Sequence, residues 1–434
     1  MQNPKRTTRL ISLLLSCIMV LQMLPVQVFA AEYATSNICG GGVTWHLDGD
    51  ILYIEGEGEM YDFLSQWDTD DNPEDKITLP PWIGKSVTKI VVGEGVTYIG
   101  NKAFYEMSDV VEAVLPSTLK GIGYYAFSYM SKLEIVNLPE GLETMDHSAF
   151  SACAALENIT IPSTLKVIPY NAFWQCTSLT DLTISYGVEE IGEGAFDGCS
   201  GIGAEGDGAN DLSTMFDGPG LQYVEIPGSV KTIGGGAFAS CTMLREVVLH
   251  EGIERIGSGA FNNCNSLYDV TLPASLKTMG EWVFDHLGGN LDFKLDELGI
   301  PVTRLQNVYI LSRELSLKAT EDYDTDMAWF NEGRPFAIFH VYEDSVAARE
   351  IEEYNAGITD EYTPKLYYSY IPDCGHELAP FVSDGENTHT RTCTEDGCTA
   401  SQTVRHTLTV DLDNLTMGDC ETDLSYRLYW TACD

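Results

Sequence analysis

Hydrophobic residues recur through the middle of this chain with a fixed period. An Ala-Phe pair, or Val-Phe in the last case, ends at Phe104, Phe127, Phe150, Phe173, Phe196, Phe238, Phe261 and Phe284. Each phenylalanine follows the one before by 23 residues, except Phe238, which follows by 42, or 23 plus an insert of 19. A constant period of this length indicates stacked structural units and argues against a closed globule.

Within each unit the apolar positions keep one register. One unit has them at Leu133, Val136, Leu138, Leu142, Met145, Ala149 and Phe150, and the next at Leu156, Ile159, Ile161, Leu165, Ile168, Ala172 and Phe173. The alternating part, Val136-x-Leu138, predicts a short strand that pairs in parallel with its neighbours in adjacent units. A turn that needs an unusual backbone angle is predicted at the glycines Gly100, Gly123, Gly192, Gly234, Gly257 and Gly280.

One unit cannot bury its own Leu, Ile and Phe side chains, so each unit depends on its neighbours. With an early unit counted from Val87 to Ile99, about nine coils stack at ~4.8 Å each and form a rod of ~40 Å. We therefore predict a right-handed solenoid with a parallel β-strand face over residues 83–290, including an insert at 201–220. A β-rich cap over residues 31–82 is expected to precede it.

The residue pattern at the start of the chain predicts an export signal. The cations Lys5, Arg6 and Arg9 precede an apolar run that is followed by Val28-Phe29-Ala30, so residues 1–30 form a predicted signal peptide. No later stretch reaches membrane-spanning length. We expect an exported protein, secreted or displayed at the cell surface, without membrane insertion.

Two further regions follow the repeats. Residues 291–372 lack the period and carry a helix-like segment after Ser345, a candidate cap, with strand-like runs around it; this α+β region is expected to close the open end of the solenoid. Residues 373–434 form a small Cys/His-rich module.

The unit pattern of Cys, then Leu-x-x-Val-x-Leu-Pro, then Leu-x-x-Ile-Gly-x-x-Ala-Phe resembles the BspA-like leucine-rich repeat proteins of bacterial surfaces. The stretch from Cys39-Gly-Gly-Gly-Val-Thr-Trp-His-Leu-Asp48 to Gly56-Glu-Gly-Glu-Met60 resembles the cap that precedes such repeats in exported proteins of Gram-positive anaerobes. The resemblance covers residues 38 to about 290 and implies a leucine-rich repeat solenoid. It also implies adhesion to host proteins or other bacteria, although many members have no known ligand.

The charge of the chain limits its partners. Acidic residues number 65 against 24 Lys plus Arg, and removal of the signal leaves 21 cations, or a net charge of −44. So negative a surface repels phosphate backbones and anionic lipid, which makes nucleic acid and membrane surfaces poor candidate partners. A host or bacterial surface protein or glycan remains as the expected partner of a monomeric protein.

Five cysteines stand three residues after a phenylalanine, in a column otherwise filled by Met107, Met130 and Leu287. They are Cys153, Cys176, Cys199, Cys241 and Cys264. A position that accepts Met or Leu is apolar. Stacked coils would also hold these side chains ~4.8 Å apart, wider than the ~3.8 Å Cβ separation of a disulfide. The column is therefore predicted to belong to the core.

The carboxy-terminal module has a different pattern. Tetrahedral Zn²⁺ accepts two imidazoles and two thiolates at short spacings, and the candidate ligands are His376, His389, Cys393 and Cys398. The segment Ser383–Cys393 also resembles Cys/His modules of other exported proteins of these bacteria, which implies metal stabilisation. A structural zinc, a disulfide pair and free thiols remain alternatives.

Binding, if it occurs, is expected on the outward face of the strands, because solenoids present such faces as extended platforms. The candidates there are Glu134, Asn137, Glu157, Asn158, Thr160, Asp181, Thr183, Tyr223, Glu225, Tyr268 and Asp269. A second group is aromatic and includes Tyr125, Tyr129 and Trp174, since exposed aromatic residues are frequent in binding hot spots. The alternative is that these are ordinary loop residues of a repeat.

These patterns favour a non-enzymatic protein that acts by binding. No nucleophile elbow or zinc-protease helix occurs in the sequence. Two alternatives remain: an exported metal-dependent enzyme that uses the Cys/His module, and a structural envelope component without a specific ligand.

Overall fold

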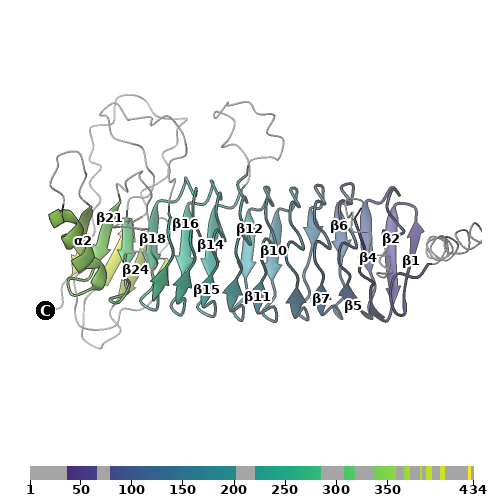
Figure 1. Ribbon diagram of the computed structural model, residues 1–434, viewed down its shortest axis with the longest axis horizontal. Helices are drawn as coiled ribbons and strands as arrows, with labels where there is room; N and C mark the ends of the chain where they lie inside the picture. The colour runs from purple at the N-terminus through teal and green to yellow at the C-terminus, as the bar shows by residue number, and fades with distance from the viewer. Residues whose placement is uncertain are drawn as a thin grey trace, which may run out of the picture.

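The computed structural model describes residues 37–65, 79–201, 220–284, 307–317, 337–357 and 366–371, together with the backbone of four strands between 382 and 431. Consecutive coils of the chain stack along one axis to form a rod (Figure 1). The predicted solenoid is confirmed. No helix in these ranges is long and apolar enough to cross a membrane.

The rod begins with a β-hairpin. Strand β1 (Val43–Asp48) pairs antiparallel with β2 (Ile51–Gly56), and β2 then pairs in parallel with β4 (Lys89–Val92). The hairpin therefore adds two strands to the first coil and covers its free edge. The short strand β3 (Gly58–Glu59) pairs with β5 (Val96–Ile99) in the same way.

The main sheet contains one strand from each coil, in parallel and in the register set by the 23-residue period. Asn158 pairs with Asp181, for example, and Ile161 with Ile184. After β4 its strands are β6 (Glu112–Val114), β8 (Ile135–Val136), β10 (Asn158–Ile161), β12 (Asp181–Ile184), β14 (Tyr223–Ile226), β16 (Glu246–Leu249), β18 (Asp269–Leu272), β20 (Asn307–Ile310), β21 (Ile338–Val341) and β22 (Tyr367–Tyr370). The ladder is interrupted between β8 and β10 and between β12 and β14.

A second parallel sheet, which the sequence pattern did not predict, lies on another side of each coil. After β3 and β5 its two-residue strands are β7 (Gly121–Ile122), β9 (Thr144–Met145), β11 (Val167–Ile168), β13 (Glu190–Ile191), β15 (Thr232–Ile233), β17 (Arg255–Ile256) and β19 (Thr278–Met279), with the ladder interrupted between β9 and β11. Two residues are too few to show an alternation of apolar and polar positions, so the prediction of a single strand face was incomplete.

The remaining side of each coil is a loop around the periodic phenylalanine, which we call the phenylalanine loop. Residues two before and two after the phenylalanine have left-handed backbone angles, as at Lys102 (φ 54°) and Glu106 (φ 60°). Alternate amides point in two directions: Ala103 donates within its coil to Gly100 O at 3.2 Å, and Phe104 donates to Ala126 O of the next coil at 2.8 Å. The coils are thus hydrogen-bonded to one another on this side as well.

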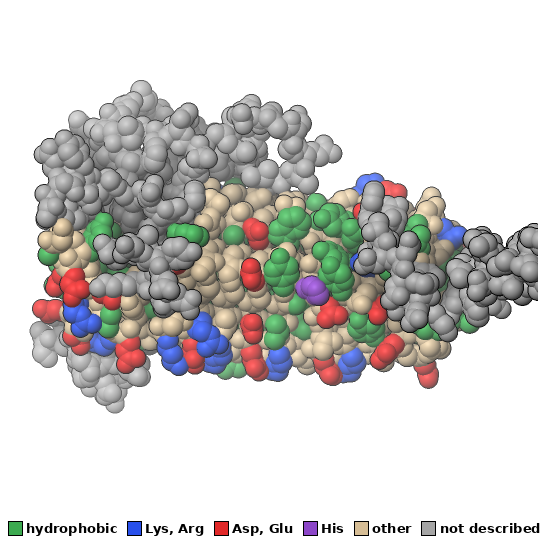
Figure 2. Space-filling model, in the orientation of Figure 1, with side chains coloured by type: hydrophobic (Ala, Val, Ile, Leu, Met, Phe, Trp, Pro, Cys, Tyr) green, Lys and Arg blue, Asp and Glu red, His purple; other side chains and the backbone are tan. Residues whose placement is uncertain are grey.

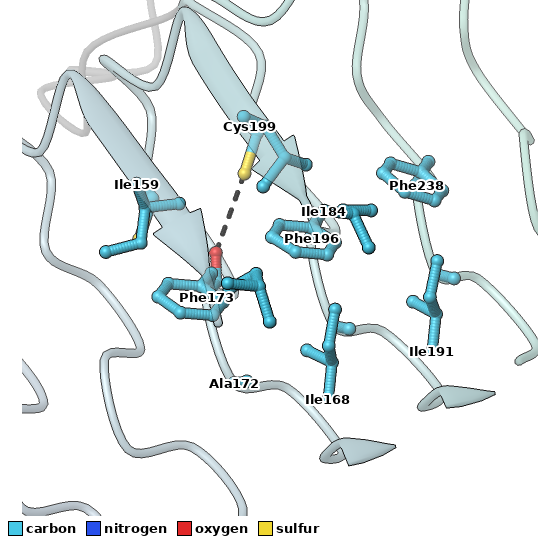
Figure 3. Packing of buried hydrophobic residues seen from close by; sticks show 14 of the residues in the cluster. Ile159, Ile168, Ala172, Phe173, Ile184, Ile191, Phe196, Cys199 and Phe238 are labelled. Carbon is cyan, nitrogen blue, oxygen red and sulfur yellow. Dashed lines mark hydrogen bonds between the residues drawn. The ribbon is translucent and has the colours of Figure 1, made fainter. Parts of the chain in front are cut away.

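The core is a column of phenylalanine rings inside the coils (Figure 3). Adjacent rings lie 4.8–5.9 Å apart between centroids, and most are stacked in nearly parallel planes. Trp82 stacks on Phe104 at 5.6 Å and ends the column on the amino-terminal side.

The cysteine column is buried and its thiols are free, which confirms its predicted place in the core. Each thiol donates a weak hydrogen bond to the carbonyl of a phenylalanine in the preceding coil, as Cys199 does to Phe173 O at 3.5 Å (Figure 3). Burial raises the pKa of the Cys176 thiol to about 12. Buried and placed against backbone carbonyls, these cysteines act as small apolar side chains.

The prediction that the repeated glycines need an unusual backbone angle was wrong. None of the six has a positive φ. Instead, the chain of the preceding coil lies too close for a side chain: a Cβ on Gly257 would lie 2.4 Å from Gly235 N, and one on Gly280 would lie 2.3 Å from Ser258 N. The glycines permit close stacking of the coils. Asp146 and Pro169 stand in the same column of two other coils, and nothing in the structure explains how these coils accept them.

The insert in the fifth coil does not interrupt the stack. Its described ends, Gly201 and Gly220, lie side by side, and Phe196 still stacks on Phe238 at 5.2 Å. Residues 202–219 lie outside the described part.

At the other end of the rod, helix α2 (Val346–Gly357) contributes Ala347, Ala348 and Ile351 to the same core. The Ser345 hydroxyl caps the helix by accepting a bond from Ala348 N at 3.1 Å, as expected from its sequence. Four strands, β23 (Val382–Ser383), β24 (Thr388–Thr392), β25 (Ser401–Arg405) and β26 (Tyr429–Thr431), form a separate antiparallel sheet.

Candidate binding surfaces of the repeat rod

The outward side chains of the main sheet form two parallel rows, which we call the strand face. Where neighbouring strands pair in register, as β10 does with β12 and β14 with β16, like positions stand side by side at ~4.8 Å intervals. Over β8 to β14 the rows contain Ile135, Asn137, Asn158, Thr160, Asp181, Thr183, Tyr223 and Glu225, all exposed.

The middle of the strand face carries unused hydrogen-bonding capacity. Within the part of the chain that the structure describes, the side chains of Asn158, Thr160, Asp181 and Thr183 have no hydrogen bond or ion pair, and neither does that of Asn137. In-register amides, hydroxyls and a carboxylate on a rigid sheet are already positioned for a ligand, so binding there would cost little ordering. Glu134 and Glu157, also predicted, are exposed just before their strands.

Further along the strand face, at β14 and β16, the polar side chains form hydrogen bonds with one another. Tyr223 donates to Glu225 Oε2 at 3.2 Å, and Glu225 Oε1 lies 2.6 Å from His250 Nε2. Burial, with Glu225 next in effect, raises the pKa of Tyr223 to about 12. His250 was missed by the sequence reasoning because it follows its strand instead of lying in it.

Two predicted members of this face are only half-exposed. Tyr268 and Asp269 belong to β18 or its start, where β20 and the strands beyond it continue the sheet. Asp269 accepts a hydrogen bond from Asn307 Nδ2 at 2.8 Å, and burial raises its pKa to about 7. Asp269 is therefore engaged with the closing strands through Asn307, and its role in ligand binding stays a prediction.

A network of hydrogen-bonded side chains continues from Asp269 across three more strands. Asn307 Oδ1 lies 3.0 Å from His340 Nε2, and His340 Nδ1 lies 2.7 Å from Ser369 Oγ. A hydroxyl, an imidazole and an orienting amide have the residue types of a nucleophile and its base. However, His340 is 1% exposed, and burial lowers its pKa to about 4. The imidazole is enclosed and neutral. We therefore interpret this network of hydrogen-bonded side chains as a connection between the closing strands.

A second surface consists of aromatic residues on the phenylalanine loops of the first four coils, counted by Phe104, Phe127, Phe150 and Phe173. This aromatic surface comprises Tyr105, Tyr124, Tyr125, Tyr129, His147, Tyr170 and Trp174. Its rings contact one another: Tyr105 lies 5.9 Å from Tyr125 and 5.6 Å from Tyr129, both edge-on. Figure 2 shows hydrophobic side chains gathered near a histidine on one face of the rod, with acidic side chains around them.

Tyr125 and Tyr129 have left-handed backbone angles, φ 53° and 60°. For a residue with a Cβ this conformation costs about 1–2 kcal/mol, and glycine adopts it freely. Other coils have Gly194 and Gly198 at the equivalent positions. The fold alone therefore does not favour tyrosine here. Tyr129 is 43% exposed and Tyr170 49% exposed.

Beside the aromatic surface lies a cavity of about 320 Å³, between residues 82–87 and the phenylalanine loop of the first coil. Its lining includes Trp82, Lys85, Lys102, Tyr105 and Asp109. Its lining carries both signs of charge.

The predicted metal ligands are not tested by this geometry. His376, Cys393 and Cys398 lie outside the described residues, and only the backbone of His389, in β24, lies within them. Across the described ranges, no group of three or more His, Cys, Asp or Glu side chains is placed to hold a metal ion. The predicted signal peptide also lies outside them.

Comparison with known proteins agrees with the repeat pattern. A family model described as "BspA type Leucine rich repeat region" matches six copies over residues 82–203 and 212–297. No curated protein matches the chain.

Among solved structures, the chain is similar to a leucine-rich repeat protein of T. pallidum, with 27% identity, a TM-score of 0.36, and coverage of 52% of this chain and 88% of that one. A leucine-rich cell surface protein from Faecalibacterium prausnitzii matches with 14% identity, a TM-score of 0.26, and coverage of 77% and 95%. The pneumococcal vaccine antigen PcpA matches with 15% identity, a TM-score of 0.28, and coverage of 77% and 98%.

Proposed function

Since the repeat region of this chain belongs to the BspA-type leucine-rich repeat family, we propose that the protein is exported and acts by binding a protein or glycan on a host or bacterial surface. It is a binding module without catalytic activity. Its expected location is the cell surface or the surrounding medium.

One observation carries the proposal: the free, in-register polar side chains at the middle of the strand face. Asn158 and Thr160 on β10 stand beside Asp181 and Thr183 on β12. An extended surface component can accept and donate hydrogen bonds at each coil without any rearrangement of the rod. Many weak contacts at ~4.8 Å spacing would then add along its length.

The test is a binding titration of labelled protein, residues 31–434, on immobilised host and bacterial surface proteins and glycans. We expect saturable binding that unlabelled protein displaces. A variant with Asn158→Ala, Thr160→Ala, Asp181→Asn and Thr183→Ala should lose it. A matched control changes exposed residues on the second sheet, Thr144→Ala and Glu190→Ala, and should bind as the parent does.

Two outcomes would oppose the proposal. Absence of saturable binding on every surface would favour a structural envelope component. Equal loss of binding in the strand-face variant and the second-sheet control would indicate a general effect on the fold.

We also propose that the carboxy-terminal module holds one structural zinc through His376, His389, Cys393 and Cys398. The donor set and the short spacings support this assignment. Elemental analysis should find one zinc per chain in the mature protein and none in a form that ends before Pro372. Absence of metal from both forms would reject the site and remove the basis of the metal-dependent enzyme alternative.

A further inference from the structure

The aromatic surface is ordered by backbone hydrogen bonds between coils. Tyr129 N donates to Ser151 O at 2.8 Å, and Ala152 N donates to Trp174 O at 2.6 Å. These bonds place the second, third and fourth coils side by side in a fixed register. The position of each aromatic residue relative to its neighbours is therefore set by the stack.

Within this register, two groups of aromatic rings flank a strip of small residues. At its loop positions the third coil has buried Ser148 and Ser151 and the half-buried Ala152, next to the exposed His147, whose ring lies 4.3 Å from that of Tyr124. The second coil presents Tyr125 and Tyr129 on one side, and the fourth presents Tyr170 and Trp174 on the other. The second and fourth coils are two spacings apart, ~10 Å, which leaves room for the side chain of a partner between the groups.

The indole of the fourth coil lies close to a carboxyl group of the next coil. Burial raises the pKa of the Asp197 carboxyl above its usual value, and the half-buried Trp174 lowers it. A half-buried indole backed by the stack offers aromatic area at little cost in side-chain entropy.

The charges around the rings favour a cation. Asp146 and Glu193 are exposed in the third and fifth coils, and Glu106 lies beside Tyr105 in the first. One ring face already accepts an ammonium group, since Lys102 Nζ lies 5.8 Å from the centroid of Tyr124. The formal net charge of the chain is −41, which attracts cationic partners from a distance.

We propose that the aromatic surface is a docking site for an arginine- or lysine-rich segment of a partner protein. Cationic side chains would lie against the tyrosine and tryptophan rings over the strip of the third coil, with the bordering carboxylates pairing further cations. This inference deepens the proposed binding function by naming a partner class, but it uses a different side of the rod from the strand face.

The test uses residues 31–434 and a labelled peptide of alternating arginine and glycine, titrated by fluorescence anisotropy at physiological salt. The decisive variant combines Tyr125→Ser, Tyr129→Ala, Tyr170→Ser and Trp174→Ser. Three of these take the residue that the third coil has at the equivalent position, and Tyr170→Ser takes that of Ser258, so the fold should be kept. The net charge is unchanged.

We expect the variant to bind the arginine peptide at least about 10-fold more weakly than the parent, because the cation–π contacts of several rings are lost. A peptide with citrulline in place of arginine, which is neutral, should bind weakly to both proteins. Circular dichroism should show the same melting behaviour for variant and parent. The strand-face variant should bind the arginine peptide as the parent does.

Three results would overturn the inference. Equal binding of the arginine peptide by variant and parent would mean that bulk charge alone attracts it. Binding of a neutral oligosaccharide, lost in the aromatic variant while arginine binding persists, would identify a glycan site. Loss of arginine binding only in the strand-face variant would move the site to that face and leave the proposed function standing.

Discussion

Replacing Gly257 by alanine tests whether the repeated glycines exist to let coils stack closely. A Cβ at this position would lie 2.4 Å from Gly235 N and 2.7 Å from Gly234 C, and both are backbone atoms of the preceding coil. Neither atom belongs to a side chain that could rotate away. The coils must therefore move apart locally to accept the methyl group.

The structure sets the size of the effect. Relief of the contact to an ordinary distance requires a shift of roughly 1 Å, which would lengthen the 2.7 Å bond from Gly257 N to Ile233 O beyond hydrogen-bond range. Loss of that bond costs about 1 kcal/mol, and overpacking adds about 1–3 kcal/mol. We expect Gly257→Ala to lower the free energy of unfolding by about 3 kcal/mol.

The matched control lies two residues away. Gly259 has φ 64°, and the nearest atom to its Cβ position is Asn262 Cβ at 3.6 Å, so Gly259→Ala has space but an unfavourable backbone angle. Its cost should be only about 1 kcal/mol. Urea unfolding followed by circular dichroism compares the two variants. If Gly259→Ala were as destabilising as Gly257→Ala, the backbone angle and not coil stacking would explain the glycines.

Further predictions concern the core and the closing strands. Phe173→Ala should lower the free energy of unfolding by about 3–5 kcal/mol, because this buried ring stacks on Phe150 at 5.4 Å and Phe196 at 5.3 Å; a loss below about 1 kcal/mol in urea unfolding would contradict the packing. The thiols of the cysteine column should resist alkylation in the folded protein and react after denaturation, as measured by mass spectrometry; rapid native labelling would show that the column is open. Burial lowers the pKa of His340 to about 4, so the folded protein binds fewer protons than the unfolded chain between about pH 4 and 6.5, and this group makes stability fall as pH falls. The Asp269 pKa of about 7 gives the opposite slope between about pH 4 and 7, so Asp269→Asn should lose stability on acidification more steeply than the parent in urea titrations at several pH values; parallel profiles would refute the assignment.

The stacked coils and their buried columns could be predicted from the sequence because the period repeats the same burial in every unit. Val136, Ile159 and Leu182 are apolar because each is buried at the same position of its unit, and the repetition shows this in the sequence. The cysteines followed from the same logic, since Met130 shares their column. One register was enough to place these residues inside the rod.

Features that depend on contacts between coils could not be read in the same way. The glycine column looked like a turn signal because sequence gives the residue type but not the 2.4 Å approach of a neighbouring chain at Gly257. Asp269 looked exposed because its partner, Asn307, lies 38 residues later and outside the period. His147 and His250 were missed because neither falls in a predicted strand. The binding roles of the strand face and the aromatic surface remain predictions.

The chain returns to the same place after each coil, and even after the insert at 201–220. The length of the rod can therefore change without a change in its faces. Gain or loss of one coil would move the ends of the rod by ~4.8 Å while every face stays aligned with itself. Duplication of a gene segment that encodes one unit would therefore extend the reach of the protein without requiring a new core. Selection on such a scaffold can change how far a site stands from whatever holds the protein, separately from what the site recognises.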